Sequence, residues 1–416
     1  MPHSVEIAAA VIFFLALVHT FATARIESLG GKYPRHAGLF HFLAEVEVVF
    51  GFWALILSLV IWLIAGSKAA IGYLEQREFT EPLFVFVIMV VAASRPVLAA
   101  VTMAVMKVAA LLPVRTEVSA IWLALFVIPL FGSIITEPAA MTLAALLLRD
   151  RLFNERVPAG IKYFGLALLF VNVSIGGVLT SFAAPPVLMV ATAWGWDTPF
   201  MAATFGWKAA VAVLFNATAF VAAVARKVPP VTAESDGEGP RIPFTVTVIH
   251  TMFLVLVVLN AHHAVVFIGA FLFFLGYTHA YDKYQSPLLL RESLLVAFFL
   301  GGLVVLGGLQ RWWLQPVVNA MGDYTLFAGA TGLTAVMDNA AITYLGSLIH
   351  GLSDQSRYFL VAGAITGGGL TVIANAPNPA GLAILSRCFP AGVSALRLLG
   401  AALPPTIVAC VAFLAL

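Results

Sequence analysis

Charged residues are scarce in this sequence. Of its 416 residues only 10% are Asp, Glu, Lys or Arg, whereas 62% are hydrophobic and the mean hydropathy is +1.01. A water-soluble globule of this size needs far more polar residues to cover its surface. Apolar stretches of about 20 residues, enough to cross about 30 Å of hydrocarbon as helix, recur along the whole chain. The composition therefore excludes a soluble protein and predicts an all-α, multi-pass membrane protein surrounded by the lipid bilayer.

Cysteine and metal-binding motifs are scarce too. The two cysteines, Cys388 and Cys410, cannot form a disulfide framework. His250 and the pair His262-His263 follow no zinc-site spacing, and the sequence contains no HExxH motif. We therefore expect no metal centre, no cofactor and no nucleic-acid partner.

The hydropathy pattern predicts ten membrane-crossing helices. They are expected at residues 4–23, 41–66, 80–110, 161–193, 204–226, 244–260, 262–281, 288–310, 357–387 and 394–414. The first stretch is followed by Ala22-Thr23-Ala24, which resembles a signal-peptidase site. No Lys or Arg precedes it, so we expect residues 1–24 to be retained as a membrane helix.

Two further apolar segments, 119–149 and 318–350, are interrupted by polar residues near their centres. These are Thr136-Glu137-Pro138 in the first and Asp338-Asn339 in the second. An apolar segment with a polar centre is typical of a re-entrant hairpin, which enters and leaves the membrane on one side. We therefore predict two hairpins in addition to the ten crossings.

The distribution of positive charge gives an orientation. If the first hairpin opens to the cytoplasm and the second to the outside, 16 of the 22 Lys and Arg residues lie inside and 4 outside. The other 2, Arg95 and Lys208, fall within spans. Cytoplasmic loops are normally enriched in Lys and Arg. The charges therefore predict that both termini lie outside.

The two halves of the chain share a pattern. Residues 1–226 and 244–416 each contain five spans and one hairpin, and a Pro- and Gly-containing linker at 227–243 joins them on the cytoplasmic side. Aligning GGVLTSFAAPP with GGGLTVIANAPN places Thr180 over Thr371 and Ala184 over Asn375, and in the hairpins Glu137 corresponds to Asp338. Because five crossings invert the second copy, the pattern is that of an inverted-repeat transporter.

Helix-breaking residues cluster in two of the spans. They are Gly176, Gly177, Pro185 and Pro186 in 161–193, and Gly367, Gly368, Gly369, Pro377 and Pro379 in 357–387. Backbone freed at the middle of the membrane cannot face lipid, because an unsatisfied amide in hydrocarbon costs several kcal/mol. We therefore expect two broken helices and two hairpin tips to meet around a buried polar site.

The doubled combination of a polar hairpin and a "GGxLTxIxxxxN" broken helix resembles the ion transporter superfamily of sodium/proton antiporters, arsenite permeases and sodium-coupled dicarboxylate carriers. The chain looks most like the bacterial sodium/proton antiporters, over nearly its full length. The resemblance implies a scaffold region, a mobile transport region, an elevator motion, a homodimer and the bacterial inner membrane.

The resemblance also implies an ion site. Its expected members are Thr136, Glu137, Asn172, Ser174, Thr180, Ser181, Asp338, Asn339, Thr343, Thr371, Asn375 and Asn378. The chain departs from the family pattern at Pro138, where Asn is common, and at Ala184, where a polar residue would match Asn375. We therefore expect a less symmetric first half-site.

Asp338 and Glu137 suggest a mechanism for exchange. An ionised carboxylate at the bilayer centre costs about 2.5 to 3.5 kcal/mol, so it is expected to be protonated or to hold a cation. Burial favours the protonated form and a bound Na+ the ionised form. Competition between the two would give exchange of Na+ or Li+ for H+. A simple helix-capping role for these residues stays open, and capping is compatible with ion binding.

Glu45 and Glu47 lie close to the cytoplasmic end of their span. We interpret them as partners of Arg95 in a structural ion pair, with a proton path as the alternative. Arg95 could instead contact an anionic substrate, in which case the protein would carry a dicarboxylate, citrate or arsenite. A membrane-embedded enzyme is the remaining class. The duplicated motif argues against it, because catalysis gives no reason to repeat a site.

Overall fold

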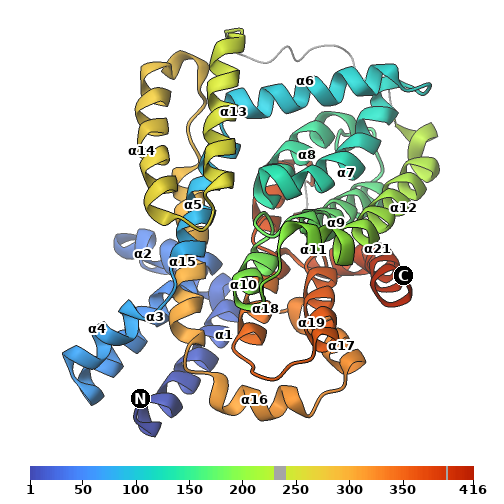
Figure 1. The fold of residues 1–416 in the computed structure, drawn as a ribbon. Coiled ribbons are helices and arrows are strands. Elements are labelled where there is room, and N and C mark those ends of the chain that lie inside the picture. The colour runs from blue at the N-terminus through green and yellow to red at the C-terminus, as the bar shows by residue number, and fades with distance from the viewer. Residues whose placement is uncertain (229–239, 390–391) are drawn as a thin grey trace.

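The computed structural model describes residues 1–228, 240–389 and 392–416, and these residues form helices and connecting loops without a strand (Figure 1). The predicted all-α class is therefore confirmed. Most of the predicted linker, 229–239, lies outside the described residues. Most of the helices form two groups by their mutual contacts, and both halves of the chain contribute to each group. The helices at residues 95–111 and 311–319, counted with the first group below, also contact the second.

The first group, called the frame group below, contains α1–α6 and α13–α16. Figure 1 shows its helices on the left, with α6 across the top and α16 across the bottom. Its helices are α1 (His3–Lys32), α2 (Ala37–Ala44), α3 (Val46–Ala65), α4 (Ser67–Glu75), α5 (Thr80–Ala92), α6 (Arg95–Leu111), α13 (Phe244–Leu259), α14 (Ala264–Ala280), α15 (Leu290–Gly307) and α16 (Arg311–Asn319).

The second group, called the site group below, contains α7–α12 and α17–α21, on the right in Figure 1. Its helices are α7 (Thr116–Ile135), α8 (Glu137–Leu152), α9 (Ala159–Gly176), α10 (Pro185–Trp194), α11 (Thr198–Met201), α12 (Trp207–Val224), α17 (Asp323–Thr334), α18 (Asn339–Ser347), α19 (Asp354–Gly367), α20 (Asn378–Leu385) and α21 (Ala395–Ala415). A π-helical segment, Ala202–Gly206, joins α11 to α12.

The interruptions predicted within four segments are present as helix breaks. α7 ends and α8 begins at Thr136, and α17 and α18 are separated at residues 335–338. α9 gives way to a short 3₁₀ turn, Gly177–Leu179, before α10 begins at Pro185, and α19 ends at Gly367 before α20. Proline can start a helix but cannot continue one, because it lacks the N–H and clashes with the preceding turn. The glycines and prolines thus break the chain as the sequence predicts.

The prediction of one straight span at 80–110 is wrong. Residues 80–111 form two helices, α5 and α6, whose axes differ by 64°. The chain bends at Ala93 and Ser94, just before Arg95 and Pro96 begin α6. Pro96 would lose a backbone hydrogen bond to Ala92 and clash with its carbonyl in a continuous helix. The bend turns α6 across the top of α7 and α8 (Figure 1).

Other boundaries also differ from the predictions. The segment 41–66 is divided at Glu45, and α4 and α16 were not predicted. Seven of the described helices are long and apolar enough to cross a membrane, or eight if α5 and α6 form one span. This number is below the predicted ten because α13 and α14 have only 16 and 17 residues and the broken helices divide into short pieces.

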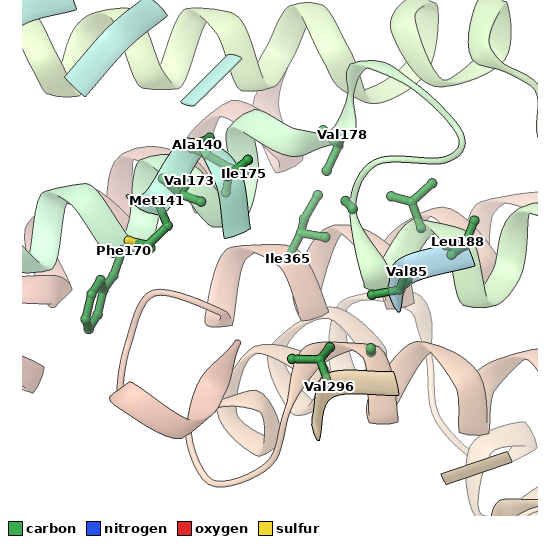
Figure 2. Packing of buried hydrophobic residues seen from close by; sticks show 14 of the residues in the cluster. Val85, Ala140, Met141, Phe170, Val173, Ile175, Val178, Leu188, Val296 and Ile365 are labelled. Atoms are coloured by element: carbon green, nitrogen blue, oxygen red, sulfur yellow. The ribbon is translucent and has the colours of Figure 1, made fainter. Parts of the chain in front are cut away.

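Small residues let the helices approach closely in both groups. In the frame group, a Cβ on Gly302 of α15 would collide with the backbone of α3 at Phe50 and Gly51. Such small-residue contacts are typical of helix packing in membranes. Where the two groups meet, Figure 2 shows Val85 of α5 beside Leu188 of α10, and both side chains are buried. The same view places Val178, next to the break after α9, near Ile365 of α19.

Candidate functional site

The first hairpin ends in a strained turn that buries a carboxylate. Thr136 has φ +79°, the only positive φ of a non-glycine residue in the described part of the chain. Such a conformation costs a residue with a Cβ about 1 to 3 kcal/mol. Glu137 follows as the first residue of α8, and its side chain is 0% exposed. The turn therefore holds an acidic side chain in the interior of the site group.

The broken helix of the first half is bonded to this hairpin. The Ser133 hydroxyl of α7 donates to the carbonyl of Gly176 (2.8 Å) and accepts from the N–H of Leu179 (3.0 Å). Thr180 donates its hydroxyl proton to the Ser133 carbonyl (2.6 Å). A Cβ on Gly176 would lie 2.7 Å from the backbone of Pro129. The hairpin thus satisfies backbone groups that the break after α9 sets free.

The tip of the second hairpin places Asp338 at the N-terminus of α18. Its Oδ1 accepts a hydrogen bond from the N–H of Ala340 (2.7 Å), and its backbone carbonyl accepts from the N–H of Ala341 (3.1 Å). This is a regular N-cap, so the capping interpretation of Asp338 is confirmed. The side chain is 8% exposed. Capping uses only part of the carboxylate, and an ion can bind to the rest.

The second broken helix contacts its hairpin in a similar way. Thr371 donates to the carbonyl of Ala335 (2.8 Å), as Thr180 does to Ser133 in the first half. A Cβ on Gly367 would lie 2.5 Å from the Thr331 carbonyl of α17. The Asn378 amide donates to the carbonyls of Gly368 (2.8 Å) and Thr371 (2.9 Å). Asn378 thereby holds the ends of the interrupted helix together.

Two contacts connect the halves at their centres. The Asn375 amide donates to Oε2 of Glu137 at 2.8 Å, and the Asn339 amide donates to the hydroxyl of Ser174 at 3.4 Å. Ser174 in turn donates to the carbonyl of Ile365 (2.7 Å). Each hairpin tip therefore contacts the broken helix of the other half, so the hairpin tips and broken helices form one connected buried site.

The site contains buried oxygens without a hydrogen-bond partner among the described residues. They are Oγ1 of Thr136, Oε1 of Glu137, Oδ1 of Asn339, Oγ1 of Thr366, Oδ1 of Asn375 and Oδ1 of Asn378. An isolated buried polar atom normally costs about 1 to 3 kcal/mol. Neither carboxylate forms an ion pair with any described Lys, Arg or His. Uncharged and carboxylate oxygens together are the ligands that hard cations prefer.

Three of the predicted site residues have other partners. Ser181 contacts Thr198 through their hydroxyls (3.2 Å), and Thr343 bonds back to the carbonyls of its own helix. Asn172 donates to the carbonyl of Leu125 (2.8 Å) and accepts from Asn216 (3.1 Å). These hydrogen bonds connect the helices around the site. None of them involves the carboxylate of Glu137 or Asp338.

The predicted pairing of Glu45 and Glu47 with Arg95 is wrong. Glu45 forms an ion pair with Arg291 near the start of α15. Arg95 lies in the first turn of α6 and donates to the carbonyl of Pro240 (3.2 Å). The bend before α6 takes Arg95 out of a continuous span, so the depth inferred from the sequence was incorrect.

The sequence analysis missed Ser133, Thr366 and Asn216. Ser133 bonds across the first break, and Thr366 has a fully buried, unpartnered hydroxyl. The repeat alignment contained a signal for Ser133, because it lies four residues before Glu137 as Thr334 lies four before Asp338. Asn216 had no such signal, since its two partners, Asn172 and Pro405, lie on distant segments of the chain.

A buried, oxygen-lined site built from broken helices and hairpin tips in a multi-pass helical membrane protein defines a membrane transporter. The family model described as "Putative Na+/H+ antiporter" matches residues 4–416. The chain therefore belongs to this family, as the resemblance in the sequence indicated.

The chain is also similar to a solved structure, the Alcanivorax borkumensis YdaH transporter, described as having an unusual topology. The two are 14% identical, with a TM-score of 0.46, over 88% of this chain and 96% of that one. A search of the curated proteins finds no significant match.

Proposed function

We propose that the protein is a secondary transporter that exchanges Na+ or Li+ for H+. The proposal depends on one observation above all. Two buried carboxylates, Glu137 and Asp338, lie at hairpin tips beside unpartnered oxygens, and no described basic side chain neutralises them. Buried charge of this kind is stable only if a proton or a cation neutralises it.

Exchange follows if the two ions share this pair of carboxylates. A protonated acid is neutral and needs no cation, whereas an ionised acid attracts Na+ to the oxygens around it. If the site group moves only after one of them has bound, outward transport of one ion requires inward transport of the other. The amide and hydroxyl oxygens suit a hard monovalent cation, and they give no basis for choosing between Na+ and Li+.

We further propose that the halves are inverted repeats and that the site group moves as an elevator against the frame group. Three paired features support this. In each half, the first helix of the hairpin packs against a glycine at the break of the broken helix. In each half, a Thr hydroxyl of the broken helix donates to a carbonyl of the hairpin. Each hairpin tip also bonds to the broken helix of the other half. The homodimer and the bacterial inner membrane are proposed from the family resemblance.

The proposed orientation has both termini outside. In Figure 1, the start of α13, which follows the predicted linker, lies at the upper end of the frame group. The N-terminus, α4 and α16 lie at the opposite end. This arrangement agrees with the orientation derived from the positive charges.

The test is exchange in everted membrane vesicles that hold a respiration-generated pH gradient, followed with a pH-sensitive dye. We expect added Na+ or Li+ to dissipate the gradient with the wild-type protein and not with Asp338→Asn. Asp323→Asn is the matched control, because Asp323 lies at the start of α17, away from the hairpin tip, and bonds to Ser356. No cation response from vesicles that contain the wild-type protein would reject the antiporter proposal.

Anion transport is the alternative that remains from the sequence. It requires a cationic contact for the anion, and Arg95 was the candidate. Because Arg95 lies at the bend before α6 and bonds to Pro240, no observation favours it as a substrate ligand. The duplicated arrangement likewise provides no catalytic cluster for an enzyme.

A further inference from the structure

The two carboxylates have different surroundings. Asp338 is the N-cap of α18, and its Oδ1 accepts a hydrogen bond from the N–H of Ala340. Hydrogen bonds from N–H groups and the positive end of a helix both favour an ionised carboxylate. Asp338 is also slightly exposed, at 8%. Its surroundings therefore stabilise the ionised form better than those of Glu137 do.

Glu137 lacks this support. It is 0% exposed, and its only hydrogen-bond donor among the described residues is the neutral amide of Asn375. Its second oxygen, Oε1, has no partner. Burial without sufficient donors favours the neutral acid over the carboxylate. The surroundings of Glu137 therefore suit a group that gains and loses a proton.

The unpartnered atoms of the Glu137 and Asn375 pair are complementary. Asn375 Nδ2 already donates to Oε2 of Glu137, which leaves Oε1 of Glu137 and Oδ1 of Asn375 without partners. Both are acceptors while Glu137 is ionised. A proton on Oε1 turns that oxygen into a donor, and the donor can then bond to Oδ1. Protonation would thus close a ring of two hydrogen bonds between the acid and the amide.

Few other charges act on the pair. Neither carboxylate forms an ion pair with a Lys, Arg or His among the described residues. The contacts of Glu137 are those of a buried acid held by the amide of Asn375.

We propose a division of tasks that rests on the proposed function: Glu137, bonded to Asn375, carries the proton, and Asp338 is the carboxylate ligand of the sodium ion. Asn375 acts as a positioning residue for Glu137. The bond from Asn375 connects the second broken helix to the tip of the first hairpin. Protonation of Glu137 removes one negative charge near Asp338 and weakens the binding of Na+ there.

The experiment measures exchange of ²²Na+ for Na+ in liposomes of phosphatidylethanolamine and phosphatidylglycerol, with equal pH on both sides. For the wild type, the Na+ concentration for half-maximal exchange is expected to rise as the pH falls, by at most about tenfold per unit. For Glu137→Gln it should not change with pH, and Na+-driven proton movement should disappear. Asp338→Asn should lose Na+ exchange altogether.

The control is Glu117→Gln, the same substitution near the start of α7, where Glu117 faces Arg115 at 4.0 Å. It should keep the wild-type pH profile. The division of tasks is overturned if Glu137→Gln keeps the wild-type profile, if Glu137→Gln folds but exchanges no Na+, or if Asp338→Asn still exchanges Na+. A wild type with no Na+ exchange and no proton movement would instead reject the proposed function.

A milder variant covers the case in which Glu137→Gln does not fold. Glu137→Asp keeps the carboxylate but withdraws it from Asn375 by one methylene. We expect the pH profile of the half-maximal Na+ concentration to move, while its value at high pH stays within about twofold of the wild type. An unchanged profile would place the proton on Asp338 and overturn the proposal.

Discussion

Gly177 leaves the room that the buried acid needs. A Cβ at this position would lie 2.6 Å from both Cγ and Oε1 of Glu137, closer than real Cβ contacts occur. Gly368, its counterpart in the second half, faces Ser174 and Asn339 in the same way. Each glycine therefore serves the contact between a hairpin tip and a broken helix, in addition to weakening the helix.

Gly177→Ala should displace Glu137 and impair exchange. We expect the exchange rate to fall by about tenfold or more, because small displacements of reacting groups are costly. The extra methyl group should also destabilise the protein by about 1 to 3 kcal/mol. Gly329→Ala is the control, since its Cβ would meet nothing within 4 Å. Equal rates for the two variants in the vesicle assay would show that Glu137 tolerates the methyl group.

The strain at Thr136 can be separated from the role of its hydroxyl. Thr136→Gly should raise the stability by about 1 kcal/mol, because glycine adopts a positive φ freely. Thr136→Val keeps the strain and removes the hydroxyl, so it should not be stabilised. Thermal unfolding in detergent, followed by size-exclusion chromatography, measures the difference. If Thr136→Gly unfolds at or below the temperature of Thr136→Val, the backbone of Thr136 is not strained.

At the scale of elements, a buried amide pair ties the helices of the site group together. Asn216 of α12 donates to Oδ1 of Asn172 on α9 (3.1 Å) and to the carbonyl of Pro405 on α21 (3.3 Å). Pro405 lies inside α21 and leaves a carbonyl of the preceding turn without its helical partner. Asn172 continues the chain of bonds to Leu125 of α7. Four helices thus share one polar network outside the ion site.

Asn216→Leu should destabilise the protein with little effect on ion affinity. The substitution leaves buried acceptors unpaired, at a cost of about 1 to 3 kcal/mol. We expect a lower unfolding temperature and a half-maximal Na+ concentration near that of the wild type. Asn260→Leu, at the exposed end of α13, is the control. A large change of Na+ affinity at unchanged stability would assign Asn216 to the ion site instead.

At the scale of the whole molecule, only a few polar contacts join the two groups near α5, α10, α15 and α18. Thr192 of α10 donates to Glu81 of α5 (3.4 Å), and Tyr344 of α18 donates to the carbonyl of Val304 on α15 (3.0 Å). These contacts surround a cavity of about 300 Å³ that Arg77 and Glu78 also line. An elevator motion would have to break them.

A cross-link between the groups should therefore stop transport. In a background without Cys388 and Cys410, the pair Glu81→Cys and Thr192→Cys is bridged with a short bifunctional thiol reagent. We expect exchange to fall to the level of protein-free vesicles and to recover after reduction. The pair Asp323→Cys and Ser356→Cys, both within the site group, is the control. Full activity of the bridged Glu81 and Thr192 pair would exclude relative motion at this contact.

Much of the fold could be predicted from local signals. The helix breaks arise at Thr136-Glu137-Pro138, at Asp338-Asn339 and at the glycines and prolines of the broken helices. These residues act on their own backbone, so the local sequence indicates where each helix breaks. The bend before α6 was missed because long apolar stretches on both sides of Ser94-Arg95-Pro96 resemble one continuous span. α4 and α16 are shorter and less apolar than the spans and gave no hydropathy signal.

The sequence by itself determined that this is a helical membrane protein whose helices break at Thr136-Glu137-Pro138, at Asp338-Asn339 and at two clusters of glycine and proline, because charge content and helix breakers are local properties. Only the tertiary structure decided which groups meet. Asn375 bonds to Glu137 across 238 residues of sequence, and Arg95 bonds to Pro240 and not to Glu45. Such pairings depend on how helices from both halves pack, and no single segment encodes that packing.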